Sequence, residues 1–373
     1  MFTSSITGPK QHSRIATDKI MQQVLLACVP GIACSTWFFG YGVIFNIVLA
    51  ATFACGFEAL VIRIRGMHPY QQLRDNSVLV TAMLFALAIP PGSPWWLIAT
   101  GIGFAVVIAK HTFGGLGQNP FNPAMSGYLL LLLAFPLDMT SWHIAHVQLT
   151  ADSAVVERLA SPLGWHGFLQ SLLLCFPFLI GENSTLIPNI DGLAMATPLI
   201  EFKMAGKSAL IAAFDSNLPL FARSSGTGWE LVNIAYLIGG VYLLFKRLIS
   251  WHIPGSILLT IAILASLFYA PNSFAIYGTS YLHLLGSATM LGAFFIATDP
   301  VSAATTARGK ILYGILIGCS IYSIRVWGSY LDSVAIAVLF GNFCAPLLDH
   351  ISSPRIYGHG RTSPWTKLRE KNK

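Results

Sequence analysis

Apolar runs long enough to cross a lipid bilayer recur along the whole chain. A helix needs roughly 20 apolar residues to span the hydrocarbon core, and somewhat fewer where it is kinked. Inside that core the backbone has no water to bond, so only helices and closed barrels span it. The sequence therefore predicts an all-α polytopic membrane protein with about ten transmembrane helices, at 20–39, 41–62, 77–90, 94–110, 122–137, 229–246, 253–270, 281–298, 311–327 and 331–350.

The charged residues fit the same interpretation. Only 10% of the 373 residues are charged and 54% are hydrophobic, whereas a soluble globular chain has about 25% charged residues. The net charge of +7 would fit a nucleic-acid partner if the basic residues formed one face. They lie instead in short stretches between apolar runs and in the tail 367-KLREKNK-373. This pattern indicates the lipid bilayer as a partner and excludes nucleic acid.

The basic residues also predict the orientation, because cytoplasmic loops of membrane proteins are enriched in Lys and Arg. With the N-terminus in the cytoplasm, the cytoplasmic side receives the basic tail and Lys10, Arg14, Lys19, Arg63, Arg65, Arg74, Lys110, Lys246, Arg247, Arg308 and Lys310. The other side receives only Arg158, Lys203, Lys207, Arg223 and, at its margin, Arg325. We expect both termini in the cytoplasm and the long segment after the fifth helix outside.

Short matching segments of sequence suggest that the two halves of the chain are related. The segment 83-MLFALAIPP-91 matches 290-MLGAFFIATDP-300 at several positions with a constant offset. Each half has five predicted helices, an odd number, so the second half is inverted in the membrane. Inverted repeats with interrupted spans are typical of folds that bind something near the bilayer midplane. The interrupted spans here are 89-IPPGSPWW-96 and 297-ATDPVS-302.

These observations divide the chain into five parts. They are a cytoplasmic segment 1–19, a first five-helix repeat 20–137, an external insertion 138–228, a second five-helix repeat 229–350 and a basic cytoplasmic tail 351–373. Between the fourth and fifth helices, 114-GGLGQNPFNPAMSG-127 is rich in turn-forming Gly, Asn and Pro. It fits a tight interhelical loop and equally a re-entrant or cofactor-contacting loop.

Ionisable residues inside a membrane are costly and point to function. Only Glu58 lies well inside a predicted helix. It fits an ion or proton path and, equally, a buried structural acid held by hydrogen bonds. Asp299, Asp332 and Asp349 lie near helix ends, where a capping or interfacial role is favoured.

No pattern typical of a soluble enzyme or a metal site is present. GxSxG, HExxH, P-loop and phosphate-binding GxGxxG motifs are absent. The six cysteines have no CxxC spacing and are interpreted as small packing residues. His143 and His146 are interpreted as an interfacial pair without a metal. We therefore assign no catalytic residue and no metal ligand to this chain.

Two threonines have similar small-residue flanks, in 191-DGLAMATP-198 and 286-GSATMLG-292. Thr197 follows a turn-forming Asp-Gly pair and is external by the charge rule. Thr289 is expected about two turns inside the eighth helix, where small residues favour close helix packing. A modifying enzyme would reach Thr197 and not Thr289. The short motif alone, however, favours an ordinary loop threonine.

Three longer sequence segments resemble those of a known protein family. They are 114-GGLGQNPFNPAM-125, 294-FFIATDPVSAATTARGKILYG-314 and 327-WGSYLDSVAIAVLFGNFCAPLLD-349. From about residue 20 to 350 the chain closely resembles the RnfD family, the D subunits of Rnf-type ion-translocating electron-transport complexes. That family is related to the B subunit of the sodium-translocating NADH:quinone oxidoreductase. The resemblance implies a multi-pass protein of the bacterial inner membrane with a periplasmic flavin-bearing loop.

The resemblance also implies a cofactor. Members of the family carry FMN as a phosphoester on a threonine, attached by a flavin transferase. The matching positions here are Asp191, Gly192, Ala196 and Thr197, with Thr197 as the acceptor. The chain departs from the family pattern at Ala194 and Met195, where a hydroxyl residue and a small residue are usual. Family members further resemble one another in holding a non-covalent riboflavin, for which no ligands are assigned here.

The expected function is that of a membrane subunit which passes electrons between its own FMN and a flavin on a neighbouring subunit. The resemblance places this step in a ferredoxin- and NAD-linked chain coupled to Na⁺ or H⁺ movement. The chain is thus expected to act as part of an oxidoreductase and translocase complex, and not alone. The alternatives are a component of a quinone-linked sodium pump and a stand-alone inverted-repeat transporter or channel.

Overall fold

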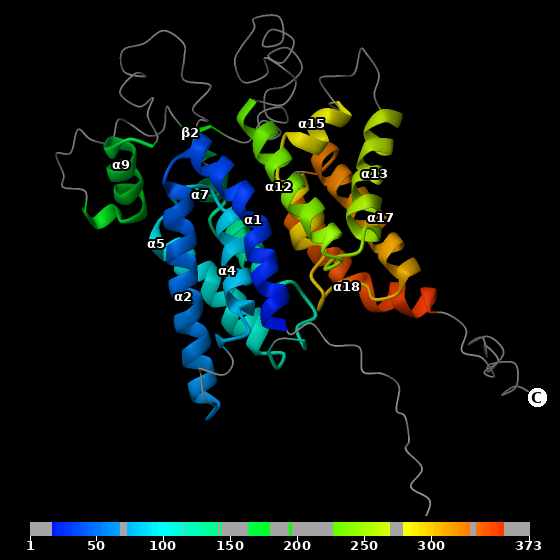
Figure 1. Ribbon diagram of the computed structural model, residues 1–373, viewed down its shortest axis with the longest axis horizontal. Coiled ribbons are helices and arrows are strands. Elements are labelled where there is room, and N and C mark those ends of the chain that lie inside the picture. The colour runs from blue at the N-terminus through cyan, green and yellow to red at the C-terminus, as the bar shows by residue number, and fades with distance from the viewer. Residues whose placement is uncertain are drawn as a thin grey trace, which may run out of the picture.

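The computed structural model describes residues 17–67, 73–115, 117–140, 142–143, 163–179, 194–195, 227–268, 279–328 and 333–353. These residues form helices almost throughout, with one short antiparallel strand pair. Figure 1 shows two groups of helices side by side, blue to cyan for the first half and green to red for the second.

The first group begins with α1 (Thr17–Phe39), α2 (Gly42–Ile64), α4 (Ser77–Ala88) and α5 (Trp95–Gly103). A π-helix, η1 (Phe104–His111), continues α5, and α6 (Pro123–Ala134) and α7 (Pro136–Thr140) follow. The insertion contributes β1 (Trp142–His143), α9 (Trp165–Cys175), η3 (Pro177–Leu179) and β2 (Ala194–Met195).

The second group contains α12 (Thr227–Phe245), α13 (His252–Leu267), α15 (Ser280–Leu285) and α16 (Thr289–Leu291). A π-helix, η6 (Gly292–Ile296), continues α16, and α17 (Ala307–Val326) and α18 (Val334–Ser352) complete the group. In the described part of the chain, five helices are long and apolar enough to cross a membrane: Thr17–Phe39, Gly42–Ile64, Gly228–Phe245, Ala307–Val326 and Val334–Ser352. Shorter apolar helices accompany them, which confirms a helical, multi-pass membrane protein.

The eighth predicted helix differs from expectation. The sequence predicted one helix over 281–298, but the structure divides it into α15, α16 and η6. The break falls at Gly286, Ser287 and Ala288, which separate the two helical pieces. Thr289 is therefore not two turns inside a helix. It is the first residue of α16, directly after the break.

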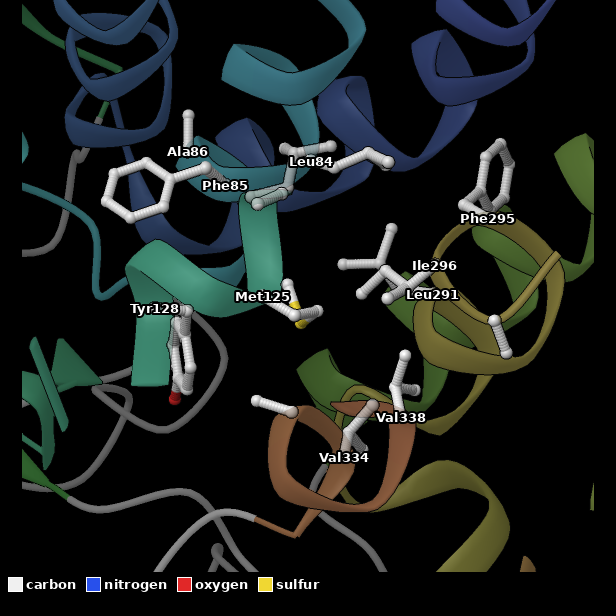
Figure 2. Close-up of a cluster of buried hydrophobic side chains, with 14 of the residues drawn as sticks. Leu84, Phe85, Ala86, Met125, Tyr128, Leu291, Phe295, Ile296, Val334 and Val338 are labelled. Carbon is white, nitrogen blue, oxygen red and sulfur yellow. The ribbon is translucent and has the colours of Figure 1, made fainter. Parts of the chain in front are cut away.

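The two groups of helices meet along a contact that we call the seam. Helix α1 packs against α12, and α6 packs against α18. Between these contacts lies an apolar core formed by α4, α6, α16, η6 and α18, which includes Leu84, Phe85, Met125, Leu291, Ile296, Val334 and Val338. In Figure 2, Leu84 and Met125 of the first half face Leu291, Ile296 and Val338 of the second, whereas Phe85 points away from the second half. The seam therefore joins the halves partly through a layer of packed apolar side chains.

Glycine makes the closest approach across the seam possible. A Cβ placed on Gly239 of α12 would overlap the backbone carbonyl oxygen of Ala27 on α1. Gly239→Ala is therefore expected to lower the free energy of unfolding by about 1–3 kcal/mol, as overpacking does. Gly56 of α2 is the matched control, because nothing lies within 4 Å of a Cβ built there. Thermal unfolding in detergent checks this, and equal losses for Gly239→Ala and Gly56→Ala would contradict it.

Candidate functional site

Glu58 lies on α2 and is only 2% exposed. Its carboxylate is paired inside the protein. The Lys110 ammonium donates to Oε1 at 2.8 Å, and His111 Nε2 lies 3.0 Å from Oε2. Lys110 is itself 2% exposed and belongs to the π-helix η1. A buried charge is tolerated when it is paired in this way.

Lys110 links this pair to the start of the broken helix α4. Its Nζ donates a second hydrogen bond, at 3.0 Å, to Oγ of Ser77. Ser77 in turn donates from its hydroxyl and its backbone N–H to Oδ1 of Asp75, at 2.7 and 2.8 Å. The resulting chain of polar contacts runs from Asp75 to Glu58 within the first half. The charge rule counted Lys110 among the cations of the cytoplasmic side, and the structure shows that its side chain is buried within η1.

A cavity of about 140 Å³ lies beside this cluster, between the two halves. Ser77, Lys110 and Asn122 line it from the first half, and Asp299 lines it from the second. Asp299 accepts hydrogen bonds from the Ser302 hydroxyl at 2.7 Å and from the Val301 N–H at 3.5 Å. These bonds stabilise a local turn at Asp299, and the next helix, α17, begins only at Ala307. By the predicted orientation, the cavity lies towards the cytoplasmic side of the seam.

Asp349 likewise has a local structural role. It accepts four hydrogen bonds, from the N–H and hydroxyl groups of Thr305 and Thr306, at 2.8 to 3.0 Å. These bonds fix the loop that leads into α17. The third aspartate of this group, Asp332, lies outside the described residues.

The glycine-rich loop before α6 connects η1 with α6. Gly114, Gly115 and Gly117 all have positive φ, which suits glycine. At the end of the loop, Asn122 Oδ1 caps α6 by accepting from the Met125 N–H at 3.2 Å. Its Nδ2 donates to the Ile296 carbonyl of η6 at 3.2 Å. The described part of the loop is thus an interhelical connection that also contacts the other half.

A second buried cation, Arg325 near the end of α17, was not predicted as a site. It is 6% exposed and donates to the Ser333 hydroxyl at 3.0 Å, the His283 carbonyl at 2.5 Å and Thr289 Oγ1 at 2.9 Å. His283 lies in α15 and Thr289 begins α16, so Arg325 joins the two sides of the break. The position of Arg325 within an apolar run is the sequence signal that could have identified it as a site.

Most of the predicted flavin-attachment motif lies outside the described residues, including Asp191, Gly192, Ala196 and Thr197. Ala194 and Met195, however, form β2, which pairs antiparallel with β1. Met195 is opposite Trp142, and Ala194 is opposite His143. The position of this strand is visible next to the upper ends of α1 and α12 in Figure 1.

Strand β1 is held at the seam by aromatic packing. The ring of Trp142 lies 4.8 Å from that of Trp229 on α12 and 5.9 Å from that of Phe39 on α1, between ring centroids. Phe39 and Trp229 also contact each other, with centroids 5.1 Å apart. Since α1 and α12 come from different halves, this cluster closes one end of the seam. The β1–β2 pairing therefore places part of the motif above that end.

Within the described residues, no group of three or more His, Cys, Asp or Glu side chains has a geometry that could hold a metal ion. His143 contributes its backbone to β1, and His146 lies outside the described part of the chain.

The comparison with known proteins decides the family. A model of the NQR2, RnfD, RnfE family matches residues 4–358. The chain belongs to the NQR2, RnfD, RnfE family. Among similar members is the D subunit of an ion-translocating oxidoreductase complex of Vibrio atlanticus (strain LGP32), 46% identical over 358 residues, which cover 95% of this chain and 98% of the relative. The protein of the same name from Salmonella paratyphi A (strain ATCC 9150 / SARB42) is 44% identical over 356 residues, or 95% and 97% of the two chains.

Membership of the family confirms the resemblance drawn from the sequence phrases. The match also extends beyond those phrases, because it includes the insertion between the two halves. The buried clusters at Glu58 and Arg325 and the strand pair next to the seam are therefore features of a member of this family.

Proposed function

We propose that this chain is the D subunit, a membrane component, of an Rnf-type ion-translocating oxidoreductase complex of the bacterial inner membrane. The observation that carries the proposal is the near-complete match to relatives with that name. The multi-pass helical architecture and the absence of soluble-enzyme motifs fit a subunit that acts only within a complex. Its partners are then the other subunits, above all a neighbouring FMN-bearing one.

We further propose that Thr197 carries FMN as a phosphoester on the periplasmic side, attached by a flavin transferase. The position of β2 supports a site suitable for attachment of the flavin. In the sequence, Thr197 follows Met195 of β2 by only two residues. The cofactor would thus be anchored near the aromatic cluster of Trp142, Trp229 and Phe39. The atypical residues Ala194 and Met195 pair with β1 in the strand register Trp142–Met195 and His143–Ala194.

In this site the FMN supplies the electron chemistry, and the chain supplies position. A hydroxyl at Thr197 binds the phosphate end and leaves the flavin ring unmodified. The anchor prevents loss of the cofactor to the periplasm and keeps it near the outer end of the seam. The resemblance to the family also implies a second, non-covalent flavin (riboflavin), for which the described residues suggest no specific ligands.

The ten-span inverted repeat is also part of the proposal. Helical stretches lie at or near the ten predicted positions, and equivalent pairs pack in equivalent ways, such as α2 on α5 and α13 on α17. A further correspondence links the two buried cations. Lys110 bonds to Ser77 at the start of α4, and Arg325 bonds to Thr289 at the start of α16. The partners are 33 and 36 residues apart along the chain, which favours a common origin.

For ion movement we propose that Glu58 lies on the path, next to the 140 Å³ cavity that Lys110 lines. Glu58→Gln keeps the shape of the side chain and removes its charge. It is expected to reduce ion uptake by proteoliposomes that contain the complex severalfold while the flavin stays attached. Uptake is measured as the number of ions moved per electron transferred. The control is Asp349→Asn, which changes a residue bonded to the N-terminal cap of α17. Uptake at the wild-type rate in Glu58→Gln would make Glu58 a structural residue.

The rival function is that of a stand-alone transporter, which the broken helices and the cavities also fit. The purified protein itself distinguishes the two. A transporter without a flavin is colourless, whereas the proposed subunit, produced with its flavin transferase, absorbs visible light as a flavoprotein. A colourless protein that transports ions alone would favour the rival. A component of a quinone-linked pump would also be yellow, but it would need quinone and not ferredoxin as the electron partner.

A further inference from the structure

A second, smaller cavity lies in the seam, directly below the aromatic cluster. Its volume is about 30 Å³, enough for one or two water-sized particles. It is lined from both halves by α1, α2, α4, α12 and the residues at the α15–α16 break. Trp142 and Trp229 are among its lining residues, so it lies under the strand pair that precedes Thr197.

Asn46, one of the residues that line this cavity, has an unpaired amide oxygen. Asn46 of α2 is fully buried. Its Nδ2 donates to the Pro90 carbonyl at 2.8 Å, which fixes the orientation of the amide group. Its Oδ1 has no hydrogen-bond partner among the described residues. A buried acceptor without a partner is costly, which indicates that the cavity holds something that binds to oxygen.

The end of helix α4 adds further oxygen atoms. The helix ends at Ala88, and Pro90 and Pro91 follow. Because proline has no N–H, the carbonyls of Ala86 and Leu87 cannot receive their i+4 hydrogen bonds. Both residues line the cavity. Helix carbonyls point towards the C-terminus, where the helix dipole is negative, so this end of α4 attracts a cation.

The remaining polar side chains leave the cavity without a positive charge or a free amide donor. No Asp, Glu, Lys, Arg or His among the described residues lines it. Asn233 lines the opposite wall, but its Nδ2 donates to the carbonyls of Trp229 and Leu285 at 2.9 and 2.8 Å, and its Oδ1 accepts from the Met290 N–H. Ser35, Tyr236, Trp142 and Trp229 also line the cavity and carry hydroxyl or indole N–H groups. The other polar groups left for an occupant are oxygen acceptors, which suit a hard cation.

We propose that this cavity binds a dehydrated Na⁺ in transit, with Asn46 Oδ1 and the carbonyls at the end of α4 as ligands. The proposal rests on the ion-translocating role proposed above and adds the place and identity of the ion. No side chain that lines the cavity in the described part of the chain accepts a proton near neutral pH, so the site suits a metal cation and not H⁺. The lack of a carboxylate makes binding weak, as release from a transport site requires. Broken-helix carbonyls at a repeat interface are a known way to coordinate Na⁺.

The test uses Asn46→Leu in the complete complex, reconstituted in proteoliposomes. Electron transfer and uptake of radioactive Na⁺ are measured against Na⁺ concentration at constant ionic strength. Loss of one ligand is expected to raise the half-saturating Na⁺ concentration by about ten- to a hundredfold. Ser93→Ala is the matched control, because the Ser93 hydroxyl also donates to the Pro90 carbonyl, at 2.7 Å, but does not line the cavity. Its half-saturating concentration is expected to stay near the wild-type value.

A second variant covers the case in which Asn46→Leu does not fold. The double variant Pro90→Ala/Pro91→Ala keeps Asn46 and supplies two N–H groups that can bond to the Ala86 and Leu87 carbonyls, which removes different ligands. It is also expected to raise the half-saturating Na⁺ concentration. Wild-type Na⁺ dependence in either folded variant would overturn the proposal.

Direct binding and flavin content keep this proposal separate from the flavin proposal. NaCl, compared with choline chloride, is expected to raise the Tm of the wild-type complex and of Ser93→Ala, but not that of Asn46→Leu. No stabilisation of the wild type would mean that a water molecule fills the cavity, which overturns the proposal. In-gel flavin fluorescence of the same samples reports the cofactor independently. Na⁺ stabilisation without covalent flavin would support the Na⁺ site while contradicting the flavin site.

Discussion

Replacing Glu58 with leucine is expected to lower the free energy of unfolding by about 3–5 kcal/mol, the usual cost of removing one partner of a buried ion pair. The reason is the position of Lys110, whose Nζ bonds to Glu58 and to Ser77 and which is 2% exposed. Without the carboxylate, its positive charge is left buried with only a neutral hydroxyl as a partner. Unfolding of the purified protein in mixed detergent measures the difference.

The double variant Glu58→Leu/Lys110→Met provides the control. An apolar pair of similar volume removes both charges and is often as stable as the ion pair that it replaces. The double variant is therefore expected to be more stable than Glu58→Leu alone. If the double variant lost as much stability as Glu58→Leu alone, the ion pair would not be the reason for the effect.

Replacing Thr197 with alanine is expected to abolish covalent flavin attachment and to reduce electron transfer through the complex to background. The substitution removes the only hydroxyl in 191-DGLAMATP-198, and with it the oxygen that would form the phosphoester. Helix packing is unaffected, because the motif lies in the insertion and not in the helices of the seam. Flavin fluorescence after denaturing electrophoresis and turnover of the reconstituted complex measure the two effects.

Thr197→Ser is the matched control for this substitution, because serine keeps a hydroxyl on the same backbone. It is expected to retain part of the covalent flavin. Thr289→Ala tests the competing threonine. It removes a partner of Arg325 and is expected to cost stability but not flavin. Full electron transfer in Thr197→Ala would show that a covalent flavin is not needed.

Hydropathy predicted the helices well because a bilayer imposes a length and a composition on each span. The segments predicted at 20–39 and 41–62, for example, are found as α1 and α2. The break at Gly286 was not predicted, since small residues in an apolar run are also typical of tight helix packing. The break is stabilised by Arg325 from α17, a contact with a residue distant in the sequence.

The buried sites were only partly predictable for a similar reason. Glu58 was found because a carboxylate inside a span is rare. Its partner Lys110 lies at a predicted helix end, so counting loop charges placed it in the cytoplasm. Asn46 carries no charge and gave no signal in an apolar run. Its importance arises from the tertiary structure, which brings it to Pro90 and the small cavity.

The most direct test of the central proposal, a covalent flavin on Thr197, is mass spectrometry of the protein produced with its flavin transferase. Intact and peptide masses are compared for the wild type, Thr197→Ala and Thr289→Ala. We predict the mass of FMN less one water on the peptide that contains Thr197, in the wild type and in Thr289→Ala only. An unmodified wild-type protein, or a flavin that persists in Thr197→Ala, would contradict the proposal.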